Sequence, residues 1–153
     1  MLEKLSVNLV EIVHETLELI KSELHRHKVE IHFSSTSNDI RIQGDTIQIS
    51  QVLLNIFRNA VEAMQEVDQR TIFVKLDQTQ EHVHLHIQDS GPGLNVELLQ
   101  KIGTPFFSTK ANGLGIGLSI SRSIIEQHNG KLLISNAEIG GACFDIYLPI
   151  LVK

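Results

Sequence analysis

The chain has 153 residues, of which 42% are hydrophobic, enough to fill the core of one ordinary domain. Its formal net charge of −5 and its scattered basic residues give no electrostatic reason to expect a nucleic-acid partner. Its single cysteine, Cys143, excludes an internal disulfide, and no apolar run approaches the ~20 residues that span a bilayer. We expect one cytoplasmic domain that does not itself enter the membrane, whether or not its parent protein is anchored there.

The first part of the chain predicts two helices separated by strands. Apolar residues recur every three or four positions over residues 7–24, which predicts an amphipathic helix. Alternating apolar and polar residues predict short strands at 29–33 and 40–42. Asp45 has the side chain of a helix N-cap, so a second helix is expected from there to about Met64.

A hairpin and a long loop follow. Residues 71–76 and 82–88 alternate in polarity on either side of a polar turn, as a hairpin requires. Residues 90–117 are rich in Gly, Ser, Thr and Pro, apart from a short helical patch at 96–102. We therefore expect most of this segment to be loop.

The last part predicts a helix and a final pair of strands. The helix covers residues 118–127 and ends at Gly130, and the strands cover 131–135 and 142–148. The mixed order of helices and strands is unlike the strict alternation of a doubly wound parallel sheet. It predicts an α+β sandwich, with three main helices packed on one face of a mixed sheet and water on the other face.

Asn55 and Asn59 lie four residues apart on the apolar stripe of the second predicted helix, so their amides point the same way. Mg²⁺ prefers oxygen ligands and keeps part of its coordination for water and substrate phosphates, so an asparagine can complete a Mg–ATP site. An isolated pair of buried asparagines more often caps or bridges backbone groups. The motifs that follow favour the nucleotide interpretation.

Asp89 follows a predicted strand directly and precedes Gly91 and Gly93, which let the backbone approach a flat ligand closely. A carboxylate at that place can accept a hydrogen bond from the exocyclic amine of adenine, whereas it would repel the carbonyl of guanine. Taken alone, Asp-Ser-Gly-Pro-Gly is more often a plain turn. As part of a nucleotide site, it predicts adenine as the base.

Gly113, Gly115 and Gly117 open a predicted helix, where glycines let backbone N–H groups close on phosphate oxygens. Upstream, Thr109 and Lys110 supply a hydroxyl and an ammonium suited to the charge of terminal phosphates. A Gly-x-Gly-x-Gly run alone is not specific. This one follows a long loop instead of a strand, unlike the dinucleotide fingerprint, and the chain contains no P-loop motif.

Taken in order, these motifs resemble the ATPase domains of the GHKL superfamily and, within it, sensor histidine kinases of the nitrogen-regulation, oxygen-sensing and dicarboxylate-sensing types. The similar segments are residues 51–62 for the N box, 89–93 for the G1 box, 105–110 for the F box, 113–118 for the G2 box and 140–144 for the last glycine motif. The resemblance spans about residues 7–149. The four boxes, in this order and at family-like spacing, are far more specific than any one of them.

The resemblance implies the Bergerat two-layer sandwich and a role for each motif. Asn59 would hold Mg²⁺, Asn55 would support the metal and the phosphates, and Asp89 would bind the adenine amine in a pocket shaped by Gly91 and Gly93. Residues 103–115 would form an ATP lid, in which two loop aromatics, Phe106 and Phe107, either dock the lid or simply pack in the core. The residues implied beside the phosphates are Thr109, Lys110, Gly113, Gly115, Gly117 and Leu118.

The resemblance also implies a phosphoacceptor histidine on a dimerising helical hairpin that precedes this domain. Only His14 hints at that motif, and because no proline follows it we expect a solvated helix residue. The chain alone should then be a monomer that binds Mg–ATP but phosphorylates itself negligibly. The implied partners are the phosphoacceptor and dimerisation domain of the parent kinase and, through the full kinase, a response regulator. Another GHKL ATPase, or a nucleotide-binding regulator without phosphotransfer, remains an alternative.

His82, His84 and His86 alternate with apolar residues, so their imidazoles share one face of a predicted strand. Because no carboxylate or thiol is evident at matching spacing, a solvated polar face is favoured over a zinc or copper site. The same interpretation covers His25, His27 and His32. His128 is expected to interact with the C-terminus of a helix.

Overall fold

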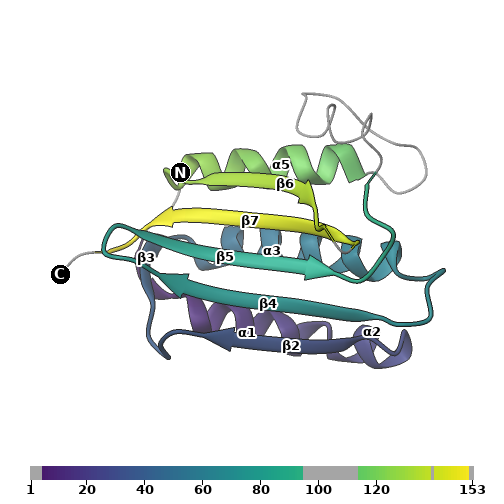
Figure 1. Ribbon diagram of the computed structural model, residues 1–153. Coiled ribbons are helices and arrows are strands. Elements are labelled where there is room, and N and C mark those ends of the chain that lie inside the picture. The colour runs from purple at the N-terminus through teal and green to yellow at the C-terminus, as the bar shows by residue number, and fades with distance from the viewer. Residues whose placement is uncertain (1–4, 95–113, 139, 152–153) are drawn as a thin grey trace.

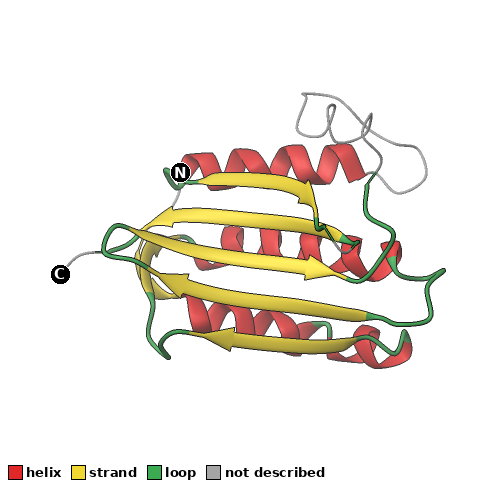
Figure 2. Ribbon diagram, in the orientation of Figure 1, coloured by secondary structure: helices red, strands yellow, loops and turns green. Residues whose placement is uncertain are grey.

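The computed structural model describes residues 5–94, 114–138 and 140–151, which form a sheet covered on one face by helices (Figures 1 and 2). The strands of the five-stranded sheet, in spatial order, are β2 (Glu30–Ser35), β4 (Thr71–Gln78), β5 (His82–Asp89), β7 (Ala142–Pro149) and β6 (Lys131–Asn136). The helices are α1 (Leu9–Leu19), α2 (Lys21–Arg26), α3 (Thr46–Ala63) and α5 (Leu114–Gln127). A small second sheet pairs β1 (Leu5–Asn8) with β3 (Arg41–Gly44).

The five-stranded sheet is mixed. β2 runs parallel to β4, whereas the pairs β4–β5, β5–β7 and β6–β7 are antiparallel. Along β4, Ile72 and Val74 are buried toward the helices, while Phe73 and Lys75 are exposed on the opposite side. This alternation is that of a sheet with one covered and one open face, so the predicted two-layer sandwich is confirmed.

Helix α3 is the central helix of the covering layer, because it packs against both α1 and α5. Asp45 caps it as predicted, its carboxylate accepting a hydrogen bond from the backbone N–H of Gln48 at 3.1 Å. Seven of its apolar side chains are buried: Ile49, Val52, Leu53, Ile56, Phe57, Ala60 and Val61. Burial of this stripe against the sheet is the main source of the layer's stability.

The single helix predicted over residues 7–24 is wrong. The Asn8 side chain accepts from the N–H groups of Val10, at 3.1 Å, and of Ile40, so α1 starts only after it. The helix then breaks at Ile20 (φ −103°, ψ 12°) before α2 begins. One turn earlier, the Thr16 hydroxyl donates to the Ile12 carbonyl at 2.7 Å, a side-chain bond that competes with helix geometry.

Helix α5 begins at Leu114, four residues before the predicted start at residue 118. It ends at Gln127, as predicted from the glycine at position 130. The left-handed residue of this helix end is Asn129, with φ of 62°. Gly130 serves a different purpose, because a methyl group there would overlap the carbonyl oxygen of Tyr147 in β7. The glycine therefore allows close packing of two backbones.

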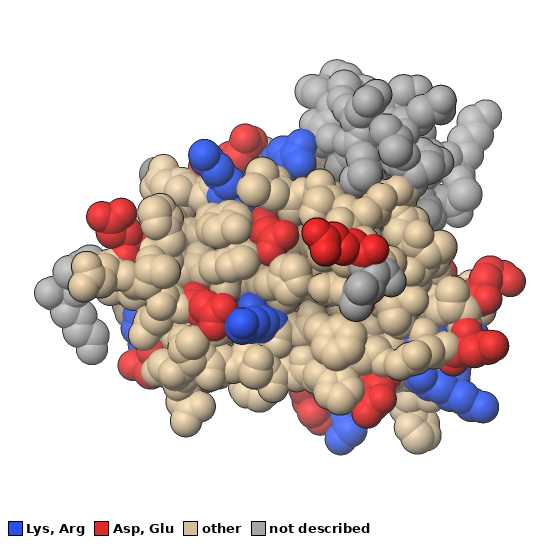
Figure 3. Space-filling view, viewed as in Figure 1, with Lys and Arg blue, Asp and Glu red and all other residues tan. Residues whose placement is uncertain are grey.

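The open face of the sheet carries the polar residues of each strand. Figure 3 shows this face from the viewpoint of Figure 1, with acidic and basic side chains interspersed among uncharged ones. Among the described residues, no helix is long and apolar enough to cross a bilayer. The helical patch predicted at residues 96–102 lies outside the described residues.

Candidate nucleotide site

Three sequence motifs meet along one line of helix α3. Asn55, Asn59 and Ala63 follow one another at four-residue spacing, so they share one face of the helix. At one end of this line, Gly117 of α5 lies against Asn55, since a methyl group on Gly117 would be 2.6 Å from the Asn55 Oδ1. At the other end, a methyl group on Gly91 would lie 3.1 Å from the Ala63 carbonyl oxygen. The predicted N-box, G1 and G2 segments are thus brought together by α3.

Asp89 is the last residue of β5 and is only 2% exposed. Its Oδ1 accepts two backbone hydrogen bonds, from the N–H of Gly91 at 2.9 Å and from that of Ala142 at 3.2 Å. Burial raises the pKa of the Asp89 carboxyl above its ordinary value, and the two hydrogen bonds oppose that rise. The side chain is therefore fixed in orientation while its charge is partly desolvated.

Two glycines hold the backbone around Asp89 in conformations that other residues adopt only with strain. Gly93 has φ of 82° and Gly141 has φ of 90°. A methyl group on Gly141 would overlap the Asp89 carbonyl oxygen, and one on Gly93 would lie 2.8 Å from Oδ1 of Asn136. The loop after β5 and the loop before β7 are consequently packed backbone to backbone.

The Asn55 end of the line is held by α5. The Asn55 amide nitrogen donates to the Ser121 hydroxyl at 3.1 Å. Asn55, Gly117 and Ser121 also line a groove between α3 and α5, whose volume is about 570 Å³. The remaining described residues of the groove are Thr46, Ile47, Ser50, Gln51, Leu54, Arg58 and Ile120.

Asn59, between the two ends, has a buried amide nitrogen with no hydrogen-bond partner among the described atoms. An unpaired buried donor costs ~1–3 kcal/mol, so such a group is normally met by water or a ligand. The Asn59 amide nitrogen is therefore a buried donor that a water or a ligand could meet.

Several predicted site residues lie outside the described part of the chain. These are Phe106, Phe107, Thr109, Lys110 and Gly113, with most of the predicted lid. Gly115 lies in the first turn of α5. Leu118 is fully buried in the core, which leaves only its backbone to face a ligand.

Three groups around the site were not predicted from the sequence. Ala142 contributes the second N–H to Asp89, and Asn136 holds Leu94 through a reciprocal pair of hydrogen bonds of 2.8 and 2.6 Å. Ser121 holds Asn55. The Gly-Gly pair before β7 could have indicated the contact between Ala142 and Asp89, because adjacent glycines often mark a close approach of two backbones.

The histidines lie mostly where predicted. His14 is exposed on α1, where its ring meets Phe33 edge-on at 4.9 Å. His128, as expected, contacts a helix C-terminus, since its Nδ1 lies 2.8 Å from the Ile124 carbonyl of α5. Its Nε2 also accepts from the Asp45 N–H at 3.1 Å, which links the end of α5 to the start of α3.

Comparison with known proteins gives consistent matches. Residues 44–152 match the family described as histidine kinase-, DNA gyrase B- and HSP90-like ATPase. The chain is 36% identical over 149 residues to the sensor histidine kinase ZraS of Salmonella typhimurium, which covers 97% of this chain and 32% of ZraS. It matches the nucleotide-free catalytic domain of the histidine kinase ThkA with a TM-score of 0.87 and 34% identity, over 96% of this chain and 97% of that domain.

ThkA is also known in complex with the response regulator TrrA, where the match covers 98% of this chain and 42% of ThkA, with a TM-score of 0.84 and 32% identity. The chain spans about a third of the length of the curated relatives it matches, 32% in the case of ZraS. Its fold, its motifs and these matches agree. The chain therefore belongs to the histidine kinase-, DNA gyrase B- and HSP90-like ATPase family and, within it, to the catalytic domains of sensor histidine kinases.

Proposed function

We propose that this chain binds Mg–ATP along helix α3 and donates the γ-phosphoryl group to a histidine on the dimerisation domain of its parent sensor kinase. The observation that carries the proposal is the line formed by Asn55, Asn59 and Ala63, with a glycine of another motif packed at each end. A nucleotide lying along this line would meet Asp89 at one end and the start of α5 at the other.

The described residues support distinct roles at the two ends. Among the described residues, both hydrogen bonds to the Asp89 carboxylate go to Oδ1, so Oδ2 would be the oxygen that accepts from the adenine amine. At the other end, Asn55 and the first turn of α5, with Gly115 and Gly117, would face the phosphates, where a helix N-terminus favours negative charge. Thr109, Lys110 and Gly113 complete this proposed end of the site.

Asn59 would hold the magnesium ion through its amide oxygen, with Asn55 as second support. When bound, Mg²⁺ neutralises charge on the phosphates and orients them. The protein's own contribution is to position the nucleotide, and the buried Asn59 amide nitrogen, which has no partner among the described atoms, is a donor that the nucleotide or its water could meet.

The parent protein supplies the rest of the reaction in this proposal. The acceptor histidine lies on a dimerising helical hairpin, and the complex of ThkA with TrrA supports a response regulator as the partner of the full kinase. We place the domain in the cytoplasm, where ATP is available. On its own it is a monomer that does not label itself.

Calorimetry with ATP and Mg²⁺ on wild type and Asn59→Ala tests the binding step. Loss of the amide oxygen should weaken Mg²⁺-dependent ATP binding by about tenfold or more, while the circular dichroism spectrum is unchanged. The matched control is Asn38→Ala, because Asn38 is an exposed asparagine between β2 and β3 and should bind as wild type does. Equal affinity of Asn59→Ala and wild type would contradict the proposed site.

The transfer step is tested by adding a separately produced phosphoacceptor hairpin domain and labelled ATP. Acid-labile phosphate on the hairpin is the expected product. Stable phosphohistidine on this chain alone would contradict the proposed division of labour. Intact ATP binding without any transfer would favour a nucleotide-binding regulator instead.

A further inference from the structure

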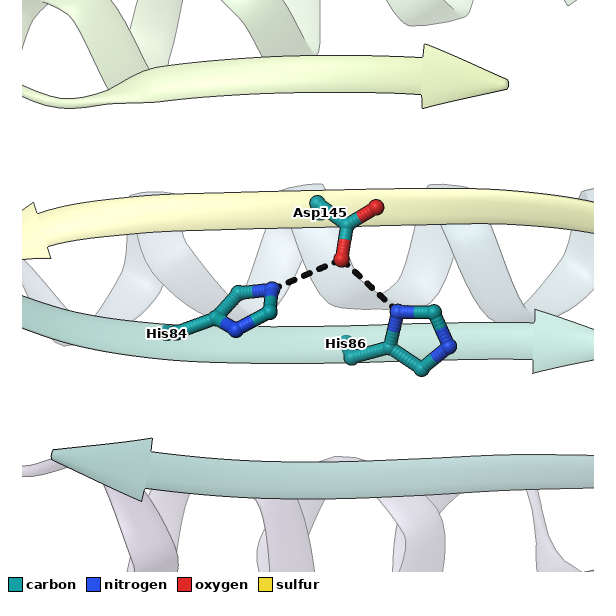
Figure 4. Close-up of side chains that lie close together, drawn as sticks. All are labelled: His84, His86 and Asp145. Carbon is teal, nitrogen blue, oxygen red and sulfur yellow. Dashed lines mark hydrogen bonds and ion pairs between the residues drawn. The ribbon is translucent and has the colours of Figure 1, made fainter.

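Three potential metal ligands meet on the open face of the sheet, away from α3 (Figure 4). His84 and His86 come from β5, and Asp145 comes from β7 directly opposite His86 in the strand register. The Asp145 Oδ1 lies 2.7 Å from Nε2 of His84 and 2.7 Å from Nδ1 of His86. One ligand atom from each residue falls within 4.8 Å of the other two. We propose that these three side chains form a binding site for a divalent transition-metal ion of the zinc type.

The geometry is close to that of a bound ion. Zinc bonds to imidazole nitrogen and carboxylate oxygen are ~2.0–2.2 Å long, so neighbouring ligand atoms of a tetrahedral ion lie ~3.4 Å apart. Each of the two contacts to Asp145 Oδ1, now 2.7 Å long, needs to open by about 0.7 Å to reach that spacing, a change of the size that side-chain rotations give.

Neighbouring side chains already fix both imidazole rings. The His84 ring stacks on Tyr147, with ring centroids 4.4 Å apart and planes 5° from parallel. His86 Nε2 lies 3.2 Å from Oε1 of Gln88, two residues along the same strand. In proteins a metal-bound histidine usually donates its second N–H to such an oxygen, because that bond fixes the tautomer and orients the ring.

This tautomer has a direct consequence for the cluster. If His86 donates from Nε2 to Gln88, its neutral Nδ1 carries a lone pair that faces the Asp145 carboxylate at 2.7 Å. Two electron-rich atoms at that distance repel each other, so this tautomer needs a cation that binds both of them, whereas the other tautomer makes the contact an ordinary hydrogen bond. A metal ion satisfies Nδ1 of His86, Nε2 of His84 and the carboxylate together.

The ligand set selects the type of ion. Two imidazole nitrogens favour zinc and its neighbours in the first transition row over Mg²⁺ and Ca²⁺, which take mainly oxygen ligands. One carboxylate offsets part of the ion's charge. Lys75 of β4 stands opposite His86 in the strand register, and its ammonium is paired with the carboxylate of Asp77 at 3.9 Å.

The site is open to solvent, so an ion can enter and water can complete its coordination. The side chains of His84, His86 and Asp145 are 32%, 28% and 18% exposed. A depression of about 620 Å³ adjoins the cluster and is lined in part by His84 and Tyr147. The sequence interpretation disfavoured a metal here for lack of a carboxylate, but β7 supplies one 59 residues after His86.

Competition between the protein and a chromophoric chelator for Zn²⁺ measures the affinity of the site. We expect one tight site in wild type and a loss of about tenfold or more in His84→Gln, His86→Gln and Asp145→Asn. His82→Gln is the matched control, because His82 lies on the same face of β5 but outside the cluster, and it should bind as wild type does. Replacing Zn²⁺ by Co²⁺ should give the strong visible absorption of a four-coordinate ion.

Circular dichroism and Mg–ATP binding by each variant establish that the fold and the separate nucleotide site are intact. Absence of a tight Zn²⁺ site in wild type would overturn the proposal. So would unchanged affinity in the three cluster variants, since the ion would then be held by other histidines.

Discussion

The backbone N–H of Ala142 donates to the buried carboxylate of Asp89, a residue 53 positions earlier in the chain. Together with the Gly91 N–H, it fixes the carboxylate from two different loops. The same carboxylate is desolvated by burial, which raises its pKa. Asp89 is thus held in a fixed orientation, and burial of its charge makes an unfavourable contribution to folding.

We expect Asp89→Asn to weaken ATP binding and to stabilise the fold at neutral pH. Asparagine retains an oxygen that can accept from Gly91 and Ala142, but it removes a charge whose burial disfavours folding. ATP binding falls because the amide is a weaker acceptor for the adenine amine. Urea unfolding and calorimetry at pH 7 measure the two effects.

The stability difference between Asp89→Asn and wild type should depend on pH. The folded pKa of Asp89 lies above its ordinary value of 3.8, so the folded chain binds more protons between those two values. The contribution of protonated Asp89 to the free energy of unfolding is fully present below the ordinary pKa of 3.8, and it is lost as pH rises through the folded pKa. The advantage of Asp89→Asn therefore grows over that window, and a difference that is constant with pH would refute this reasoning.

Gly141→Ala should destabilise the fold far more than Gly140→Ala. Both residues have positive φ, 90° and 104°, and so both alanines carry the conformational strain of about 1 kcal/mol. Only at Gly141 would the added methyl group also overlap the Asp89 carbonyl, whereas space around Gly140 is open. The difference in melting temperature between the two variants measures the steric overlap at Gly141, because both variants share the conformational strain. Similar melting temperatures would contradict the predicted backbone contact.

Gly117→Ala should lower ATP affinity through its effect on Asn55. The new methyl group would lie 2.6 Å from Asn55 Oδ1, so the amide must move and its hydrogen bond to Ser121 is lost. Ser121→Ala removes that hydrogen bond without adding bulk. We expect Ser121→Ala to weaken binding less than Gly117→Ala does, by fluorescence titration with an ATP analogue, and the reverse order would count against displacement of Asn55.

His128→Ala should destabilise the fold by about 2–3 kcal/mol, because it leaves the N–H of Asp45 and the carbonyl of Ile124 without their side-chain partner. His128 is only 3% exposed, so a cavity adds to this cost. His25→Ala, at an exposed position of α2, should change the free energy of unfolding little. Denaturant unfolding of both variants checks the contrast, and equal losses would show that the His128 link contributes nothing.

The sequence was sufficient where structure is decided locally. The cap at Asp45, the length of α3 and the β4–β5 hairpin all follow from patterns within about twenty residues. The break at Ile20 was missed because apolar spacing continues across it, from Leu17 to Leu24. The Thr16 hydroxyl bond to the Ile12 carbonyl, one turn before the break, likewise leaves the periodicity unchanged.

For the site, residue types were predictable but their partners were not. Asn59 and Asp89 stand in recognisable motifs, and their chemistry follows from their side chains. That Ala142 would hold Asp89, or that Asp145 would stand beside two histidines, depends on β7 pairing with β5. Such long-range pairing is decided by the packing of the whole sheet, and no local pattern encodes it.

The placement of β7 between β5 and β6 also constrains the order in which the molecule can assemble during synthesis. Among the described strands, β7 comes last in the chain and yet lies in the interior of the sheet. Until β7 is made, β5 presents an unpaired edge and Asp89 lacks the Ala142 N–H. A ribosome-bound fragment that stops before residue 142 should therefore be unable to bind nucleotide and prone to associate through β5. Competence for ATP would then be acquired in one late step, when the last described strand inserts into the middle of the sheet.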